Sequence, residues 1–255
     1  MKKTNFEVTL KKIEGKTSFF EKFYQETAIE QFSDLKIKKK PGTWVQINFK
    51  GYPRFPKYLL PELKELSLVE EIIKQRVSSR EFTGKPIDKK QLSRLLLFSS
   101  GILNEKGAWN DSRRGYPSAG ARYPLEVYVV IPRTEDLPAG IYHYNVKLHS
   151  LEQILRGKYL NRVAKIAGQK WAKKASVVFI ISAVHRRTSA KYTARAMRYI
   201  FIEAGHLAQN LYLLSTAYGL GCCAIGGFND REINSLLDIK EEGEAVIYMI
   251  AIGVL

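Results

Sequence analysis

A short stretch near residue 80 combines arginine and serine in a spacing that suits a phosphate group. In QRVSSREF, Arg76, Ser78 and Arg80 occupy alternate positions directly after a segment predicted to be helical. In an extended chain alternate side chains project to one side, so two guanidinium groups and one hydroxyl would face the same ligand. Arginine donates charge-assisted, fork-shaped hydrogen bonds, and serine adds a neutral donor. The spacing suits a phosphate site, although an exposed arginine pair taken by itself is more usually solvated.

Two further stretches add glycines and cations to this pattern. The segment RRGYPSAGARYPLEVYVV, residues 113–130, places a small-residue turn and Arg122 in front of an apolar run predicted to be a buried strand. The segment AIGGF places Gly226 and Gly227 directly after another apolar run. Together with the arginines near residue 80, these loops point to a phosphate-bearing ligand more specifically than one arginine pair does.

Other site chemistries find no support in the sequence. The string GLGCCA, residues 219–224, matches the G-x-G-x-x-A dinucleotide pattern, but it follows a predicted helix and opens a predicted strand. A dinucleotide site needs the opposite order, because the helix N-terminus binds the pyrophosphate, so these glycines are interpreted as a helix C-cap. The two cysteines are adjacent, the four histidines are scattered, and no HExxH or G-x-S-x-G pattern occurs. We therefore expect core cysteines, no catalytic triad and no metal site.

The composition is that of a basic globular chain. Its 255 residues are 45% hydrophobic, which suffices for one large domain with or without a small appendage. The formal charge of +16 indicates an anionic partner: nucleic acid, a phosphate-bearing cofactor or an acidic peptide. The longest apolar stretches reach about half of the roughly 20 residues that a membrane-spanning helix needs, and no signal peptide is recognisable. We expect a cytoplasmic protein without membrane contact.

The order of the predicted elements indicates an α+β fold. Ser67 and Asp88 are candidate N-caps of two helices, and Gly101 is a candidate stop for the second. A short helix is predicted near residues 230–237. Apolar, β-branched runs predict strands at 125–132, 139–155 (two strands about a turn near Asn145), 175–184 (buried on both faces) and 244–255.

The strongest predicted element is one long amphipathic helix over Ser189–Ala217. Apolar residues recur there at steps of three and four from Met197 onward. At about 1.5 Å per residue this helix would run roughly 40 Å, which is longer than a small domain needs. We therefore expect part of its apolar stripe to pack against a second subunit.

The first 60 or so residues differ from the rest of the chain. They are rich in lysine and phenylalanine, contain the run KIKKKPG at 36–42, and end in the proline-punctuated GYPRFPKYLLPELK. We predict a small basic N-terminal module with its connector over residues 1–62 and the main domain over residues 63–255. The lysine run is interpreted as a solvated loop, with a nucleic-acid or peptide contact as the alternative.

Five stretches together resemble the nitroreductase-fold flavoenzymes, and within them the SagB-type dehydrogenases. They are RVSSREF, RRGYPSAGARYPLEVYVV, AGIYHYN, KYTARAMRYIFIEAGHLAQNLYLLSTAYGLGCCAIGGF and the closing IYMIAIG. The strings YPSAGARYPLEVY and EAGHLAQNLYL are the most specific. The resemblance implies a nitroreductase-like fold, with a central mixed or antiparallel sheet flanked by helices. The subfamily includes azoline oxidases, which make thiazoles and oxazoles in ribosomally made peptides.

The resemblance also implies FMN held at a homodimer interface. It assigns the phosphate to Arg76, Ser78 and Arg80. The backbone N–H groups of Gly226 and Gly227 would donate to the N5 and O4 region of the flavin and stabilise negative charge on reduction. The residues that would line the flavin from the partner subunit are Pro117, Ser118, Ala119 and Gly120, with Arg122 as a further polar contact.

One departure from the family pattern concerns the phosphate. Many simple nitroreductases hold it with a lysine and an arginine after the last strand, whereas this sequence ends at Leu255, directly after that strand. We therefore expect other cations to substitute, and Arg114, Arg195 and Arg198 are the candidates.

A lysine and a tyrosine are the implied catalytic pair. Lys191 and Tyr192, at the start of the predicted long helix, match a Lys-Tyr pair that the subfamily associates with proton removal. Arg195 and Arg198 would repel the Lys191 ammonium and favour the neutral base, and the alternative is a solvated cationic helix end. The pair would assist loss of a proton from the substrate α-carbon while a hydride passes to the flavin, which dioxygen would reoxidise.

Two other functions stay open. The same fold also reduces nitro groups, quinones or activated alkenes with NAD(P)H, so a reductase is the first alternative. The second is a non-catalytic module that docks a peptide or nucleic acid through the basic N-terminal region, against which the intact PSAGAR and AIGG stretches argue. The azoline reading implies a peptide or small-molecule substrate and other enzymes of a peptide-modifying complex as partners, and makes a nucleic-acid partner unexpected.

Overall fold

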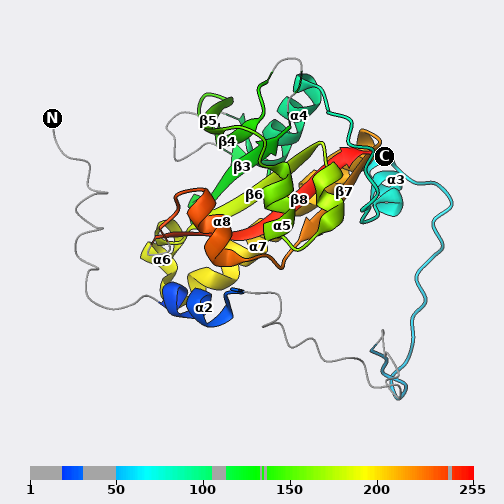
Figure 1. Cartoon of the computed structure of the whole chain (residues 1–255). Coiled ribbons are helices and arrows are strands. Elements are labelled where there is room, and N and C mark those ends of the chain that lie inside the picture. The colour runs from blue at the N-terminus through cyan, green and yellow to red at the C-terminus, as the bar shows by residue number, and fades with distance from the viewer. Residues whose placement is uncertain (1–18, 31–49, 105–112, 133, 135–136, 241–242) are drawn as a thin grey trace, which may run out of the picture.

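A six-stranded sheet forms the centre of the fold (Figure 1). The computed structural model describes residues 19–30, 50–104, 113–132, 134, 137–240 and 243–255, so the lysine run at 36–42 lies outside the described residues. The strand order is β5-β4-β3-β6-β8-β7, and each neighbouring pair is antiparallel. The strands are β3 (Leu125–Ile131), β4 (Gly140–Asn145), β5 (Ser150–Arg156), β6 (Val177–Val184), β7 (Leu220–Ile225) and β8 (Glu244–Val254).

Helices cover both faces of this sheet, as the α+β prediction requires. On one face, Phe179 of β6 packs in a buried cluster with residues of α4 (Lys89–Ser100) and α7 (Ala196–Ala217). On the other face, Ile180 of β6 packs with residues of α5 (Leu160–Ile166) and α8 (Asp230–Leu236). Successive strand residues point to opposite faces, so β6 is apolar except for the buried Ser182, as predicted for a strand buried on both sides.

The predicted helix caps are confirmed. Ser67 caps α3 (Leu68–Gln75) and Asp88 caps α4, and each forms a capping box in which the side chain three residues later accepts from the backbone N–H of the cap. At the end of α4 the N–H of Gly101 donates to the carbonyls of Leu96 and Leu97. Two short strands lie between α4 and β3 in the chain. They are β1 (Ile102–Asn104) and β2 (Arg113–Arg114), and they pair with each other.

The prediction of one continuous helix over Ser189–Ala217 is wrong. The chain forms α6 (Arg186–Tyr192), a single 3₁₀ turn η5 (Thr193–Arg195) and then α7. The break occurs at Thr193, which has φ +49° and ψ −137°, a conformation that interrupts the helical hydrogen-bond pattern. Lys191 and Tyr192 therefore lie in the last turn of a separate short helix.

The apolar stripe of α7 packs mainly against the chain's own sheet. Ile200, Leu207 and Leu211 are fully buried in the cluster that contains Phe179. Phe201 and Ile202, on another side of the helix, are 41% and 55% exposed. Packing within the chain therefore explains most of the stripe without a second subunit.

None of the helices in the described part of the chain is both long and apolar enough to cross a membrane.

The described part of the N-terminal region includes one helix that contacts the main body. In α2 (Phe19–Thr27), Phe20 stacks on His185 with ring centroids 4.2 Å apart, and the hydroxyl of Tyr24 donates to Oδ1 of Asp230 at 2.8 Å. Residues 50–67, in contrast, contain no helix or strand and leave Leu59 95% exposed. The division at residue 62 stays a prediction.

Candidate active site

Gly120 lies directly against the predicted catalytic pair. It sits in the short turn η3 (Ala119–Ala121) with φ +61°, a conformation that favours glycine. A Cβ atom on Gly120 would lie 2.7 Å from Oη of Tyr192 and 3.0 Å from Nζ of Lys191. The chain thus brings the PSAG turn and the end of α6 together, although some 70 residues separate them in the sequence, and leaves no room for a side chain between them.

A buried glutamate of α7 holds this turn in place. Oε1 of Glu203 accepts from the backbone N–H of Ala119 at 2.9 Å, and Ser118 Oγ in turn accepts from the N–H of Tyr123 at 2.8 Å. Glu203 is only 3% exposed, and its other oxygen, Oε2, is buried without a partner among the described residues. Burial raises the pKa of Glu203, and the hydrogen bonds from Ala119 and Ser118 oppose this rise.

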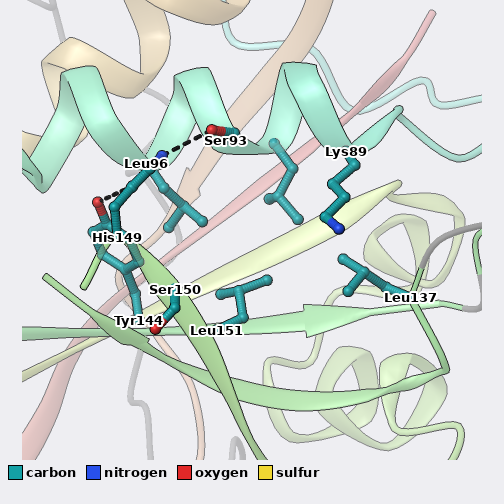
Figure 2. Close-up of a pocket in the computed structure, with 9 residues that line it drawn as sticks. Lys89, Ser93, Leu96, Leu137, Tyr144, His149, Ser150 and Leu151 are labelled. Atoms are coloured by element: carbon teal, nitrogen blue, oxygen red, sulfur yellow. Dashed lines mark hydrogen bonds between the residues drawn. The ribbon is translucent and has the colours of Figure 1, made fainter.

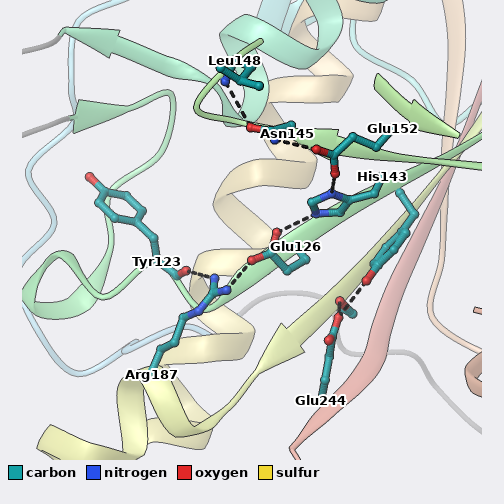
Figure 3. A network of polar contacts seen from close by, with 10 residues as sticks. Tyr123, Glu126, His143, Asn145, Leu148, Glu152, Arg187 and Glu244 are labelled. Atoms are coloured by element: carbon teal, nitrogen blue, oxygen red, sulfur yellow. Dashed lines mark hydrogen bonds and ion pairs between the residues drawn. The ribbon is translucent and has the colours of Figure 1, made fainter. Parts of the chain in front are cut away.

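The other end of α6 is tied to the sheet by a polar network (Figure 3). Arg187 donates to the carbonyl of Tyr123 at 3.1 Å and pairs with Oε1 of Glu126 on β3 at 2.5 Å. The second oxygen of Glu126 lies 3.0 Å from Nε2 of His143, whose Nδ1 lies 3.0 Å from Glu152. These contacts fix the start of α6 next to the residues that follow the PSAG turn, and so help position Lys191 and Tyr192.

The pKa values in this network follow from its contacts. Burial alone would raise the pKa of Glu126, but the hydrogen bond from His143 and the contact with Arg187 outweigh it and lower the pKa. The hydrogen bond to Glu126 is the main cause that raises the pKa of His143, against a smaller opposing effect of burial. The network therefore stabilises a charged imidazolium between two carboxylates.

A second group gathers around Tyr212 of α7. Its hydroxyl accepts from the backbone N–H of Ala224 on β7 at 2.8 Å and shares a hydrogen bond of 3.0 Å with Oγ of Ser78. The guanidinium of Arg76 lies over the Tyr212 ring, 5.5 Å from its centroid, and the N–H of Ser79 donates to the carbonyl of Cys222. Residues 76–79 are thus fastened beside β7, close to the strand that leads into the glycine pair.

The remaining predicted site residues are accessible. Ser78, Arg80 and Arg122 are exposed, and Arg76 is half-buried. Gly226 is exposed directly after β7, and no atom lies within 4 Å of the position that a Cβ would occupy there. At Gly227 such a Cβ would meet only Ile29, at 3.8 Å.

The two groups lie on different sides of α7. Glu203 and Tyr212 are nine residues apart in this helix, which corresponds to about two and a half turns and roughly 13 Å along the axis. Their side chains therefore leave the helix in nearly opposite directions. One chain presents the Gly120–Lys191–Tyr192 group on one side of α7 and the Arg76–Ser78 group on the other.

Three arginines, Arg114, Arg195 and Arg198, were the candidates to replace the phosphate-binding cations that follow the last strand in simple nitroreductases. Their contacts lie outside residues 76–80. Arg114 lies 4.6 Å from the ring centroid of Tyr123, and Nε of Arg195 donates to Oη of Tyr199 at 3.2 Å. Arg198 is exposed beside Phe201. Because the helix breaks at Thr193, Arg195 is not one helical turn beyond Lys191, so the expected i,i+4 repulsion between them lacks its geometric basis.

Two residues of this site escaped the sequence predictions. Glu203 lies between Ile200 and Leu207 in the apolar stripe, and a carboxylate at such a position was the available signal of a buried polar role. Tyr212 comes directly after Leu211 and gave no signal of its own, because its contact with Ser78 joins residues far apart in the sequence.

The two adjacent cysteines lie in the core. Cys222 and Cys223 are both buried in β7 as free thiols, and burial raises the pKa of Cys222 to about 12. Such a thiol is protonated at neutral pH and a poor nucleophile, as expected for a core residue. In the part of the chain that is described, no group of three or more His, Cys, Asp or Glu residues could hold a metal ion.

The donor set around residues 76–80 fits a flavin mononucleotide. Two guanidinium groups and the Ser78 hydroxyl supply charged and neutral donors for one terminal phosphate. No atom lies within 4 Å of the Cβ position of Gly226, so a ligand can approach the backbone closely there. The residues present thus have the chemistry that such a cofactor requires.

The family of the chain follows from its match to a family model. Residues 73–254 match the model described as the Nitroreductase family. The chain belongs to the nitroreductase family. It is accordingly an oxidoreductase, with the nitroreductase-like α+β fold predicted from its sequence.

Relatives of this nitroreductase-family chain include both nitroreductases and peptide-processing proteins. A Methanocaldococcus jannaschii protein named as a nitroreductase is 38% identical over 183 residues, covering 71% of this chain and 89% of that protein. The Escherichia coli microcin B17-processing protein McbC is 24% identical over 219 residues, covering 84% of this chain and 74% of McbC.

A solved structure shows the same fold over nearly the whole chain. In the Escherichia coli microcin synthetase McbBCD complex, solved with truncated pro-MccB17 bound, one chain matches with a TM-score of 0.62 at 21% identity. The match covers 99% of this nitroreductase-family chain and 94% of the other. At that identity the likeness concerns the fold.

Proposed function

We propose that this oxidoreductase is a SagB-type dehydrogenase that oxidises a thiazoline or oxazoline in a ribosomally made peptide to the thiazole or oxazole. The observation that carries the proposal is the position of Lys191 and Tyr192 against Gly120. The likeness to the microcin B17-processing protein McbC supports a peptide as the substrate. A Lys-Tyr pair beside a bound flavin has a task in azoline oxidation, where a carbon-bound proton must leave.

Residues 76–80 and the glycine loops would hold FMN. Arg76, Ser78 and Arg80 would bind its phosphate, and the N–H groups of Gly226 and Gly227 would face the ring. The turn from Pro117 to Gly120, with Arg122, would line the ring from a partner subunit. When bound, FMN supplies the acceptor for the two electrons that leave the substrate as a hydride, and dioxygen is the final oxidant.

Lys191 and Tyr192 would move the proton that accompanies this oxidation. Conversion of an azoline to an azole removes one hydride and one proton, and the pair receives the proton from the substrate α-carbon. Glu203 supports this task indirectly, because it holds the turn against which both side chains rest. Arg187 does the same from the start of α6.

We further propose that the functional unit is a homodimer. The two groups of site residues lie on different sides of α7, and a second copy of the chain can bring one group opposite the other across a shared interface. The neighbour with the same fold is part of the McbBCD complex, whose structure holds truncated pro-MccB17. By analogy, other enzymes of a peptide-modifying complex would be partners of this homodimer.

An NAD(P)H-dependent reductase is the second candidate, because the 38% identical archaeal relative is named as a nitroreductase. The two functions differ in what reduces the flavin. The test mixes the purified, flavin-loaded protein anaerobically with an azoline-containing peptide or with NAD(P)H and follows bleaching of the flavin absorbance. Rapid bleaching by the peptide, with formation of the azole detected by mass spectrometry, supports the dehydrogenase. Bleaching by NAD(P)H but not by the peptide would contradict the dehydrogenase.

A further inference from the structure

A cavity of about 330 Å³ lies between α4 and the strands β4 and β5, apart from the candidate active site. Figure 2 shows its lining, with α4 above and the strands below. Its size falls at the lower end of the range for small-molecule sites. The lining residues are Lys89, Leu92, Ser93, Leu96, Leu137, Tyr144, His149, Ser150 and Leu151.

One end of the cavity contains a chain of three hydrogen-bonded side chains. Nε2 of His149 lies 2.8 Å from Oγ of Ser93, and Nδ1 of His149 lies 2.7 Å from Oη of Tyr144. Tyr144 is fully buried, which raises the pKa of its hydroxyl to about 12, so the hydroxyl stays protonated and needs an acceptor. If Tyr144 donates to Nδ1, Nε2–H donates to Ser93, and the Ser93 hydroxyl hydrogen is left to donate into the cavity.

The backbone at His149 is part of this arrangement. His149 has φ +45°, which places it in the left-handed region at the end of the turn between β4 and β5. Histidine tolerates this region better than most residues, yet the conformation is still costly. The two hydrogen bonds of its ring hold the imidazole between Ser93 of α4 and Tyr144 of β4, so the strained turn presents an ordered polar group to the cavity.

The other end of the cavity is electropositive. Lys89 is the first residue of α4, and Figure 2 shows its side chain extending towards Leu137. The N-terminus of α4 already has the carboxylate of its N-cap, Asp88, which accepts from the N–H of Gln91 at 2.6 Å, so the cations of the first turn, Lys89 and Lys90, remain for a ligand. No ion pair involves Lys89 among the described residues. An anion at this end would pair with Lys89.

Between the two ends the lining is apolar. Leu92 and Leu96 of α4 are buried, and Leu137 and Leu151 are half-buried opposite them. Lys89 and Ser93 are four residues apart on the helix, about 6 Å along its axis. A ligand that uses both ends therefore needs a compact apolar body between an anionic group and a hydrogen-bond acceptor.

We propose that this cavity is a binding site for a small organic carboxylate with an apolar body. The carboxylate pairs with Lys89, the apolar body lies on Leu92, Leu96 and Leu151, and the far end accepts from Ser93. The proposal is independent of the proposed function, because it involves none of the flavin or proton-transfer residues.

The test follows His149 by NMR during a titration of the purified protein with benzoate, which supplies the carboxylate and the apolar body of the proposed ligand but no acceptor for Ser93. The chain has four histidines, so the ring proton signal of His149 can be assigned from its loss in His149→Gln. We expect this signal to shift saturably at millimolar benzoate and the signal of His206, on α7, to stay in place. Benzyl alcohol, which has the same body without the charge, is expected to bind about fivefold more weakly.

Three variants complete the test. Lys89→Gln is expected to weaken benzoate binding about fivefold, whereas Lys90→Gln, the exposed neighbour outside the lining, leaves it unchanged. Lys191→Ala also leaves it unchanged, which excludes the candidate active site as the origin of the signal. Absence of a saturable shift, equal effects of Lys89→Gln and Lys90→Gln, or loss of binding in Lys191→Ala would each overturn the proposal.

Discussion

The backbone N–H of Ala119 donates to Oε1 of Glu203 at 2.9 Å, and this bond joins the turn beside the candidate catalytic pair to α7. Because Glu203 is 3% exposed, removal of its carboxyl leaves a buried donor without an acceptor. Glu203→Ala is expected to lower the free energy of unfolding by about 1–3 kcal/mol. Glu203→Gln keeps an acceptor and is expected to retain the turn. The rate of trypsin cleavage after Arg122 reports on the order of this turn. We expect cleavage to be faster in Glu203→Ala than in the parent and unchanged in Glu203→Gln.

The pH dependence of stability gives a second test of Glu203. Its raised pKa means that the folded state binds a proton more tightly than the unfolded state. The stability contribution is therefore fully present below the ordinary carboxyl pKa of about 4.5 and is lost as the pH rises through the folded pKa. Glu203→Gln should remove this loss, so its stability relative to the parent should increase from pH 4 to pH 8 in urea unfolding. A difference that is constant with pH would show that Glu203 is ionised alike in both states.

Gly120 is expected to tolerate no side chain. Gly120→Ala adds a Cβ within 2.7 Å of Tyr192 Oη at a residue with φ +61°. The conformational cost alone is about 1–2 kcal/mol, and relief of the contact must displace Tyr192 or Lys191. We expect substrate oxidation to fall at least tenfold while bound flavin is retained at saturating FMN. Gly205→Ala, on α7 with no atom within 4 Å of its Cβ position, serves as the control and should behave as the parent.

Some features of the fold and of the site could be predicted from the sequence, and others could not. The caps at Ser67 and Asp88 and the strand β6 were predicted correctly, because capping and burial leave local patterns in the sequence. The break at Thr193 left no such pattern, since the apolar periodicity resumes in α7 and no glycine or proline marks the break. The roles of Glu203 and Tyr212 depend on long-range contacts and only the structure reveals them.

Charge reversal at Arg76 is expected to weaken FMN binding without unfolding the protein. Arg76 lies over the ring of Tyr212 beside Ser78, where the phosphate is placed. Loss of one charge-assisted hydrogen bond, about 1.5–3 kcal/mol, corresponds to roughly a 10- to 100-fold increase in the Kd for FMN. Lys74→Glu makes the same change of charge on the exposed last turn of α3 and should leave the Kd within about twofold. Equal weakening by both variants would mean that Arg76 acts only through net charge.

The ion pairs of His143 are expected to make the free energy of unfolding fall as the pH rises above neutrality, on the alkaline side and not on the acid side. The pKa of His143 is raised, so its contribution is fully present below about pH 6.5 and is lost as the pH rises through the folded pKa. The lowered pKa of Glu126 acts at the acid end, where its contribution is lost as the pH falls below about 4.5. His143→Gln should cost about 1 kcal/mol near pH 6 and less at pH 9. His206→Gln, exposed on α7, should show no such trend.

The most direct test of the proposed chemistry replaces both candidate proton-transfer residues. Lys191→Ala with Tyr192→Phe removes the two groups that rest against Gly120 and leaves every proposed FMN contact in place. In a single-turnover assay with an azoline peptide under anaerobic conditions, the rate of flavin bleaching by substrate is expected to fall by about 10²–10⁴-fold, with an unchanged flavin spectrum before mixing. Bleaching near the parent rate in the double variant would show that the proton leaves by another route and would contradict the assignment of Lys191 and Tyr192.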